Sequence, residues 1–224
     1  MVEKTQPSNS NAEGFPAEYY AALLAGLIHK LNNINTVVSG HSGLLLLEPN
    51  LRGDILHPVQ QMSRAAQLLS RYVDEAAVMT KAVPLYPESV SLSELFESLE
   101  FPPGLSTRKQ FSGQPKVLAD RRKLKEIFEQ IFRNASEANA KSTVVTAGTH
   151  SGFVEIRFRD DGHGIKPPVM SRVFDPFFTT RKPEENFGLG LFRARGDLAR
   201  IKGEISAESD GNTYTEILVR LPAG

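Results

Sequence analysis

Residues 160–191 read DDGHGIKPPVMSRVFDPFFTTRKPEENFGLGL, and this stretch decides the fold. It follows residues 153–159, where apolar and charged side chains alternate as they do in a half-buried strand. The strand would therefore place Asp160 at its end, beside a glycine-containing turn. A carboxylate in that position can accept hydrogen bonds from an exocyclic amine such as that of adenine. The sequence thus favours a nucleotide site at this end of the strand.

Two pairs of glycines flank this stretch. Gly162 and Gly164 follow the aspartate, whereas Gly188 and Gly190 precede a helical pattern that begins near Leu191. Glycine has no Cβ, so a ligand can come close to the backbone at each pair, and the free N–H groups of a helix start favour phosphate. Either pair alone is typical of a surface turn. The sequence lacks both G-x-x-x-x-G-K-[ST] and a strand followed by G-x-G-x-x-G, so the usual phosphate-binding signatures do not apply.

Three segments resemble boxes of the ATP-binding domain of sensor histidine kinases. They are DDGHGI (residues 160–165), DPFFTTR (residues 175–181) and GLGL (residues 188–191). That family belongs to the wider group that includes heat-shock chaperone and mismatch-repair ATPases, and the FFTTR run resembles its nitrogen-regulation subgroup. The resemblance implies ATP and Mg²⁺ as cofactors. It assigns nucleotide contacts to Asn134, Asp160, Gly162, Gly164, Thr179, Thr180, Arg181, Gly188, Leu189 and Gly190.

The segment between the glycine pairs, residues 166–187, is expected to form a mobile lid over the ATP. The resemblance implies that Phe177 and Phe178 anchor the lid by apolar contact, and plain core packing is the alternative explanation for the pair. Arg181 could neutralise phosphate charge. Asn186 stands where many relatives carry Gly, and Asn tolerates a positive φ better than most residues do.

Composition narrows the classes of function. The 224 residues contain 26 basic and 26 acidic side chains, and this balance argues against a nucleic-acid partner. The chain has no cysteine, which excludes disulfides and thiolate chemistry. It has no apolar run long enough for a membrane span, and residues 1–16 are polar and expected to be disordered. We therefore expect a cytoplasmic protein whose signal could come from a separate sensor protein.

The first half, residues 17–82, reads as two helices joined by a turn. Apolar residues recur in each at spacings of three and four, as on a heptad seam. The rows are Leu24, Leu27, Leu31, Ile34, Val38, His41 and Leu45, then Ile55, Val59, Met62, Ala66, Leu69, Val73 and Ala76. Two antiparallel helices cannot bury both rows well, so a homodimer that forms a four-helix bundle is expected. Packing against the second half of the same chain is the alternative.

His29 lies off this apolar row, and by position alone it reads as a surface histidine. Its context GLIHKLNNIN (residues 26–35) resembles the phosphoacceptor box of histidine kinases, which makes His29 the implied acceptor. Asn33, one turn on, matches a residue that orients water for dephosphorylating the partner. Lys30 replaces the usual Glu or Asp and cannot accept a hydrogen bond from the imidazole, so autophosphorylation is expected to be slow, to use another acceptor or to be absent. His41 is expected to be buried in the core.

The second half reads as a linker over residues 83–90 and a catalytic domain over residues 91–224. Helices are expected over residues 92–100 behind a Ser91-x-x-Glu94 capping box, over 121–140 behind an Asp120 cap, and over 191–202 before a C-terminal Gly203. Strands are expected over residues 117–119, 142–148, 153–159, 204–209 and 213–221. Together they predict a sheet of about five strands with helices on one face, a two-layer α/β sandwich.

The run EQIFRNA (residues 129–135) resembles the family's asparagine box. Glu126, Gln130 and Asn134 are four residues apart and share one helix face, where a polar row is normally the wet side of an amphipathic helix. The resemblance implies that Asn134 binds Mg²⁺ through its carbonyl oxygen, which suits a hard cation. It gives Gln130 a catalytic place usually held by Asn or His, and Glu126 is a weaker candidate for orienting water or metal.

The sequence thus predicts an α+β protein, with a helical hairpin followed by an ATP-binding sandwich. The leading interpretation is a histidine kinase that phosphorylates His29 and passes the group to an aspartate on a response-regulator receiver domain. Two alternatives stay open. Lys30 suggests a kinase-impaired phosphotransfer or adaptor dimer, and Asn33 suggests a phosphatase-biased member of the same family. A general ATPase of the chaperone or mismatch-repair kind lacks the hairpin and the histidine box.

Overall fold

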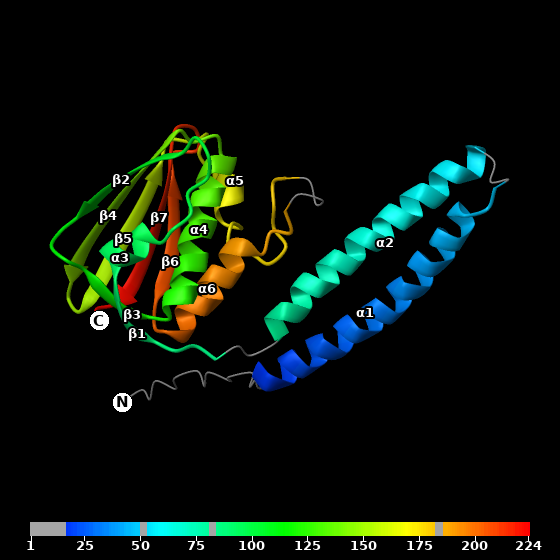
Figure 1. Ribbon diagram of the computed structural model, residues 1–224, viewed down its shortest axis with the longest axis horizontal. Helices are drawn as coiled ribbons and strands as arrows, with labels where there is room; N and C mark the ends of the chain where they lie inside the picture. Colours follow the sequence, from blue (N-terminus) through cyan, green and yellow to red (C-terminus); the bar gives the residue numbers. More distant parts are fainter. Residues whose placement is uncertain (1–16, 50–52, 81–83, 182–185) are drawn as a thin grey trace, which may run out of the picture. The chain divides into compact units, whose positions relative to one another are not determined.

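A computed structural model describes residues 17–49, 53–80, 84–181 and 186–224 of the chain (Figure 1). The chain divides into two compact units, Met1–Ala82 and Val83–Gly224. Of the helices in the described ranges, none combines the length and apolar character that a membrane crossing would need. The expectation for residues 1–16 lies outside the described residues.

The first unit is a hairpin of two long helices, α1 (Ala17–Leu46) and α2 (Gly53–Thr80). Its seam is narrow and differs from the expected one. The buried residues of α1 are Ile28, Asn35 and Ser42, seven residues apart, and those of α2 are Val59, Ala66 and Val73. The α2 residues belong to the predicted row, but the α1 residues do not.

The predicted α1 row lies mostly outside this seam. Leu27 and Ile34 are 50% and 61% exposed, and His41 is exposed, so the expectation that it is a core residue was wrong. The buried seam contains small and polar side chains, which let α1 and α2 approach each other closely. The bulkier leucines of α1 lie outside this seam, on the outer surface of the hairpin. Asn35 fixes the pairing of the helices because its Nδ2 donates to the Ala66 carbonyl (2.8 Å) and to Ser70 Oγ (2.7 Å).

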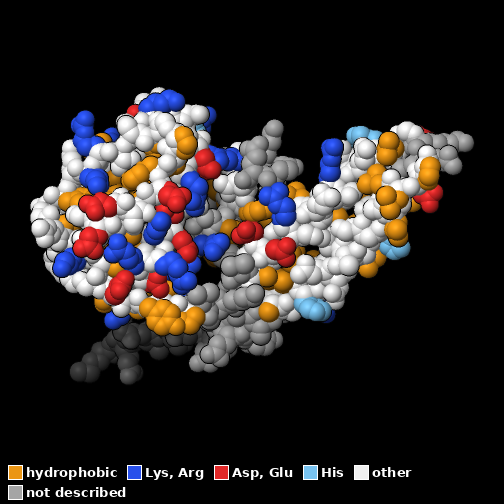
Figure 2. All heavy atoms as spheres, in the orientation of Figure 1, with side chains coloured by type: hydrophobic (Ala, Val, Ile, Leu, Met, Phe, Trp, Pro, Cys, Tyr) orange, Lys and Arg blue, Asp and Glu red, His pale blue; other side chains and the backbone are white. Residues whose placement is uncertain are grey.

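The hairpin consequently exposes many large apolar side chains. They are Leu24, Leu27, Leu31, Ile34, Val37, Leu44, Leu45, Leu47, Ile55 and Met62. Figure 2 shows hydrophobic side chains gathered along the hairpin on the visible face. Single exposed apolar residues are ordinary, but a contiguous set of this kind is typical of a surface that another element covers.

The second unit combines helices with two sheets. Its helices are α3 (Leu92–Glu97), α4 (Arg121–Glu137), α5 (Pro167–Met170) and α6 (Gly190–Arg200). Its strands are β1 (Glu88–Ser91), β2 (Ser106–Phe111), β3 (Lys116–Ala119), β4 (Ser142–His150), β5 (Phe153–Asp160), β6 (Glu204–Ser209) and β7 (Thr215–Pro222). The five-stranded sheet has the order β2-β4-β5-β7-β6, and β1 pairs with β3 in a separate two-stranded sheet. Because β2 is parallel to β4 and the other pairs are antiparallel, the larger sheet is mixed.

The α4 and α6 helices lie side by side over one face of the larger sheet (Figure 1). Between the layers, aromatic rings fill the core. The Phe128 and Phe158 centroids lie 4.8 Å apart in an edge arrangement, and Phe96 and Phe132 pack around them. Such ring pairs add stability beyond the area they bury. The expected two-layer α/β arrangement is therefore present.

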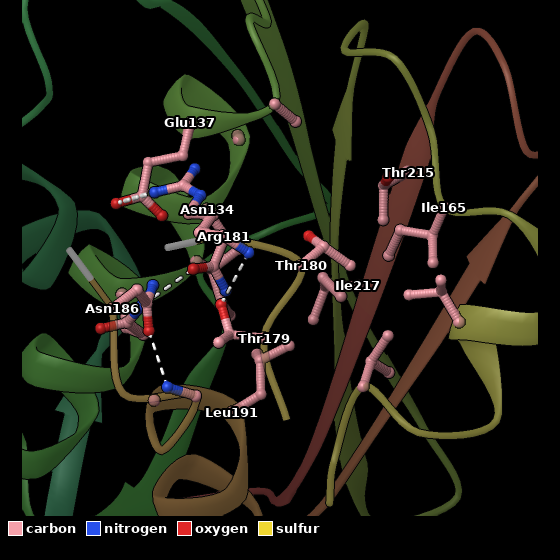
Figure 3. A pocket seen from close by; sticks show the side chains of 18 of the residues that line it. Asn134, Glu137, Ile165, Thr179, Thr180, Arg181, Asn186, Leu191, Thr215 and Ile217 are labelled. Carbon is pink, nitrogen blue, oxygen red and sulfur yellow. Dashed lines mark hydrogen bonds and ion pairs between the residues drawn. The ribbon is translucent and has the colours of Figure 1, made fainter. Parts of the chain in front are cut away.

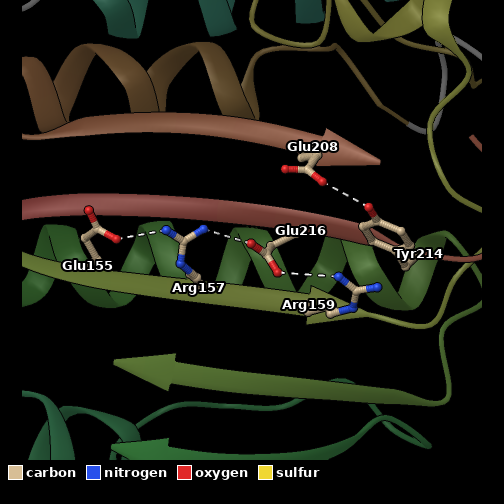
Figure 4. A network of polar contacts seen from close by, with 6 residues as sticks. All are labelled: Glu155, Arg157, Arg159, Glu208, Tyr214 and Glu216. Atoms are coloured by element: carbon tan, nitrogen blue, oxygen red, sulfur yellow. Dashed lines mark hydrogen bonds and ion pairs between the residues drawn. The ribbon is translucent and has the colours of Figure 1, made fainter. Parts of the chain in front are cut away.

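The opposite face of the sheet is charged and carries a chain of ion pairs (Figure 4). Arg157 contacts Glu155 at 2.8 Å and Glu216 at 3.0 Å, and Glu216 also contacts Arg159. Tyr214 donates to Glu208 at 3.0 Å. In β5, apolar side chains point to one face of the sheet and charged side chains to the other. This explains the strict alternation over residues 153–159 in the sequence.

Two strands escaped prediction. The β1 strand, Glu88–Ser91, lies at the end of the segment that was expected to be a linker, residues 83–90. The β2 strand is an edge strand whose residues STRKQF are mostly exposed, which leaves no apolar alternation to detect. The expected β3 segment exists, but it pairs with β1 and not within the larger sheet.

Helix ends also differ from expectation. The α3 helix begins without a side-chain hydrogen bond from Ser91, so the capping box is not formed. By contrast, Asp120 caps α4 by accepting from the Lys123 N–H at 3.1 Å, as predicted. After α6 the left-handed residue is Lys202 (φ 59°), while the Gly203 N–H donates to the Leu198 carbonyl at 2.8 Å. Gly203 is required for space, since an added Cβ would lie 2.7 Å from Leu221 Cδ2.

Candidate functional site

A cavity of about 360 Å³ lies between α4, the end of β5, the start of α6 and the described part of the predicted lid. That volume is in the range of small-ligand sites. The structure brings most of the expected site residues to it, namely Gln130, Asn134, Asp160, Gly164, Thr179, Thr180, Arg181, Gly188 and Gly190. Gly162 and Leu189 were also expected to contact the nucleotide, but they do not line the cavity. Figure 3 shows part of its lining.

Asp160 is the buried acidic group of this cavity, only 8% exposed. Burial raises the pKa of its carboxyl group, and the nearby Asp161 adds to the rise, although the Gly162 and Thr215 N–H groups oppose it by hydrogen bonding. The Gly162 N–H lies 2.9 Å from Asp160 Oδ1. A fixed and poorly solvated carboxylate of this kind is an oriented acceptor for a ligand amine.

Glycines near the cavity allow neighbouring segments of the chain to pack closely against one another. A Cβ on Gly162 would lie 2.8 Å from the Ala138 carbonyl oxygen, so the turn after β5 packs directly on the end of α4. A Cβ on Gly190 would lie 2.6 Å from the Gln130 side chain, so a larger residue there would require this side chain to move. The start of α6 therefore lies close against α4 at the cavity.

The α4 helix contributes a polar row. Gln130 Nε2 donates to Asn134 Oδ1 at 2.8 Å, and Arg133 donates to Gln130 Oε1 at 2.9 Å. This chain fixes the orientation of the Asn134 amide and leaves its oxygen with further acceptor capacity. Glu126, expected as a weaker member of the row, does not line the cavity and pairs with Lys123.

Sequence reasoning missed Glu137, which ends α4 and lines the cavity. Its Oε1 lies 2.8 Å from Arg181 Nη1 (Figure 3). The spacing from Asn134, three residues, places both on one helix face and could have identified it. Arg181 therefore has an acidic partner from another element.

The described part of the lid meets the cavity through Phe178. The Arg172 guanidinium lies 4.3 Å from the centre of the Phe178 ring. Phe178 lines the cavity, whereas Phe177 has a positive φ of 60° and is 46% exposed. That the two phenylalanines anchor the lid stays a prediction. The Asn186 Oδ1 accepts from the Gly188 N–H at 2.8 Å, and Gly188 has a positive φ of 67°.

The start of α6 offers backbone donors to the cavity. Leu189 is the N-cap and makes no side-chain capping bond, while Gly190 and Leu191 line the cavity. The first N–H groups of a helix lack partners within it and attract anions. The hydroxyls of Thr179 and Thr180 stand beside them.

These groups fit an adenine nucleotide. Asp160 provides an amine acceptor beside the apolar Ile165, Val169 and Ile217, and Arg181 with the α6 N–H groups provides phosphate donors. For a metal, the described residues contain no group of three or more acidic or histidine side chains suited to a cation. Asn134 could hold Mg²⁺ together with phosphate oxygens and water molecules, since this ion usually takes few ligands from the protein.

His29 and Asn33 lie on α1, in the first unit. His29 is exposed, as predicted, and its Nδ1 lies 3.4 Å from Asn33 Nδ2. Lys30, also exposed, extends no acceptor to the imidazole. The ring is therefore open to another molecule or domain, with Asn33 as its nearest polar neighbour.

Comparison with known proteins shows what this chain is similar to. Residues 119–224 match the family described as histidine kinase-, DNA gyrase B- and HSP90-like ATPase. Sporulation kinase A of Bacillus subtilis is 27% identical over 89% of this chain and 34% of its own length. Sensor histidine kinase ZraS of Escherichia coli is 27% identical over 86% of this chain and 44% of its own length. The chain therefore spans between a third and a half of these curated relatives.

Solved structures show the same fold. Full-length ShkA in complex with AMPPNP matches 91% of this chain and 46% of its own, with a TM-score of 0.58 at 22% identity. The mycobacterial sensor histidine kinase MprB matches 62% of this chain and 98% of its own, with a TM-score of 0.52 at 19% identity. The fold is thus a helical hairpin followed by a mixed-sheet ATP-binding domain of the histidine kinase type.

Proposed function

We propose that this chain, whose residues 119–224 carry a histidine kinase-like ATPase domain and whose homologues are sensor histidine kinases, transfers the γ-phosphoryl group of ATP to His29 and then to a response regulator. The observation that carries the proposal is the cavity. It brings together the buried Asp160, the N-terminus of α6, the Arg181 guanidinium and Asn134. The same chain carries the exposed His29 in a phosphoacceptor-like sequence. The FFTTR run favours the nitrogen-regulation subgroup.

Within the cavity each group has a separate task. Asp160 accepts from the adenine amine and selects the base, while Gly162 and Thr215 keep its carboxylate oriented through their N–H groups. The N–H groups at the start of α6 and the Thr179 and Thr180 hydroxyls donate to phosphate. Asn134 holds Mg²⁺, which when bound neutralises phosphate charge, and Gln130 fixes the Asn134 amide. The protein's share in such a transfer is mainly positioning and charge neutralisation.

His29 is the proposed acceptor because neutral imidazole is nucleophilic near pH 7. Lys30 offers no acceptor for the other ring nitrogen, so this transfer is expected to be slow. Its ammonium can instead attract the incoming phosphate. A receiver-domain aspartate would then take the group from the exposed imidazole.

The hairpin supports a homodimer. Its outer apolar set remains uncovered within the hairpin, and a second copy would bury it as a four-helix bundle. A symmetric pairing of this kind uses the same surface on both copies. Signal input from a separate sensor protein belongs to the same proposal.

Two other functions remain candidates on specific observations. Lys30 favours a phosphotransfer or adaptor dimer with little kinase activity. The Asn33 amide beside His29 favours a phosphatase-biased protein, in which Asn33 orients water toward the partner's phosphoaspartate. In that case Asn33→Ala would keep ATP binding and lose dephosphorylation of the partner.

Incubation with γ-labelled ATP and Mg²⁺ tests the proposal. Wild-type protein should acquire acid-labile label, and Asp160→Asn should lose both label and ATP binding. Asp161→Asn is the matched control, because the Asp161 carboxylate faces the Lys141 and Ser142 N–H groups and does not line the cavity. Equal ATP binding by Asp160→Asn and wild type would refute the assignment of the site.

A further inference from the structure

The ion pair between Glu137 and Arg181 joins two elements across the cavity. Glu137 is the last residue of α4, and Arg181 follows the FFTT run. Their side chains are 32% and 28% exposed, and Glu137 Oε1 lies 2.8 Å from Arg181 Nη1. Figure 3 shows the two side chains pointing toward one another, beside Asn134. The contact therefore belongs to the wall of the cavity and not to the open surface.

The charges of the cavity make this pair consequential. Among the described residues that line it, Arg181 is the only lysine or arginine, whereas Glu137 and Asp160 are both acidic. The other phosphate donors are neutral hydroxyl and backbone N–H groups. A guanidinium engaged by a carboxylate offers a phosphate less net attraction than a free one does. Among the described lining residues, the one permanent cation is thus already paired with an acidic side chain.

We propose that Glu137 competes with nucleotide phosphate for Arg181 and thereby sets both the affinity for ATP and its preference over ADP and AMP. This inference rests on the proposed ATP site. Phosphate oxygens must displace the Glu137 carboxylate from the guanidinium fork, since both ligands use the same planar donors. Opening the pair costs the same for every nucleotide whose phosphate reaches Arg181, and repulsion by the Glu137 carboxylate grows with phosphate charge, so the pair weakens ATP more than ADP and AMP. Glu137 is a specificity-determining residue in this account, and its own carboxylate need not touch the nucleotide.

The size of the effect follows from the exposure of the pair. Partly exposed ion pairs contribute roughly 0.2–1 kcal/mol, which corresponds to about a 1.4- to fivefold change in affinity. Glu137→Gln keeps the side chain's shape and removes its charge. It should tighten ATP binding by that factor, and the gain for ADP and AMP should be smaller.

The experiment is calorimetric titration of the full chain with ATP, ADP and AMP in EDTA, so that metal does not mask the carboxylate. Glu94→Gln is the matched control. Glu94 pairs with an arginine, Arg121, at 3.5 Å, and neither residue lines the cavity. We expect Glu137→Gln to bind all three nucleotides more tightly, with the largest gain for ATP and a wider ATP-to-AMP affinity ratio, and Glu94→Gln to match wild type. Circular dichroism of each variant verifies the fold.

Repeating the measurement in an Arg181→Gln background distinguishes competition for Arg181 from simple repulsion between Glu137 and phosphate. In Arg181→Gln, the gain from Glu137→Gln should shrink because no guanidinium remains to be released. An equal gain in both backgrounds, unchanged affinity, or weaker ATP binding by Glu137→Gln would overturn the inference. The last result would mean that Glu137 holds Arg181 in place for the phosphate. These outcomes all require that wild type binds ATP, so failure of wild type to bind would instead refute the proposed function.

Discussion

The two units of this chain bury their apolar residues in opposite ways. The ATP-binding unit encloses a set of phenylalanines, packed mostly edge to face, between a sheet and two helices. The hairpin buries only a narrow row of side chains, which includes Asn35 and Ser42, and it leaves most of the predicted leucine row exposed. A structure that is complete by itself places its largest side chains inside. The exposed leucines of the hairpin are typical of a surface that binds a partner. The enclosed core of the ATP-binding unit is typical of a domain that folds without one.

The largest expected effect lies in the enclosed core. Phe128→Ala should lower the unfolding free energy of the ATP-binding unit by about 3–5 kcal/mol, because it removes a fully buried ring and leaves a cavity. Urea unfolding followed by far-UV circular dichroism measures the loss. As a control, Phe177→Ala removes a ring that is 46% exposed and should cost much less. Equal losses would show that the buried aromatic core does not carry the stability of this unit.

An intermediate effect is expected on the hairpin's outer surface. Ile34→Asp changes a side chain that is 61% exposed within the hairpin. If a second copy covers this surface, a charge there should weaken dimerisation by at least about tenfold, or 1.4 kcal/mol. Sedimentation equilibrium over a range of concentrations reports the dissociation constant. Gln67→Asp introduces the same charge at an exposed polar position and should leave it unchanged. A dimer that tolerates Ile34→Asp would need a different interface.

The smallest expected effect is on the pH dependence of stability, to which the adjacent carboxylates of Asp160 and Asp161 contribute with opposite signs. Hydrogen bonds from Ser142 lower the pKa of Asp161, so its carboxylate stabilises the fold at neutral pH. That contribution is lost as the pH falls through the lowered folded pKa. Burial raises the pKa of Asp160, so its carboxylate costs stability at neutral pH. The cost disappears as the pH falls through the raised folded pKa.

We therefore expect substitutions of opposite sign at pH 7. Asp161→Asn should lower the melting temperature, and Asp160→Asn should raise it while it abolishes nucleotide binding. Both differences from wild type should fade in acid. Thermal unfolding at pH 7 and at pH 3 measures them. A shift of the same sign for both variants at pH 7 would contradict the account of their surroundings.

Much of the ATP-binding unit was predictable because its strands and helices each bury one face. The alternation over residues 153–159 identified β5, and the resemblance of residues 129–135 to the asparagine box pointed to Gln130 and Asn134. The edge strand β2 was missed because its residues are mostly exposed and show no apolar alternation. The pairing of Glu137 with Arg181 was missed because it depends on how the segment after Phe178 folds back onto α4, which no local pattern encodes.

The hairpin shows a different limit. A heptad row in a sequence indicates a buried surface but not which partner buries it. The α2 row contributed Val59, Ala66 and Val73 to the seam, as predicted. The α1 row did not, because Ile28, Asn35 and Ser42 make the close contact and the leucines face outward. The sequence therefore identified the two helices correctly and assigned the wrong face of α1 to the pairing between them.

The central claim is that His29 receives phosphate from ATP, and the chain contains a well-matched control for it. His29 has the Asn33 amide at 3.4 Å, and His57 on α2 has the Gln61 amide at 3.3 Å, so both are exposed histidines with an amide one turn away. The decisive measurement is acid-labile incorporation from γ-labelled ATP in His29→Gln and His57→Gln. We predict that His29→Gln loses the label and His57→Gln retains it. Label that persists in His29→Gln would contradict the account.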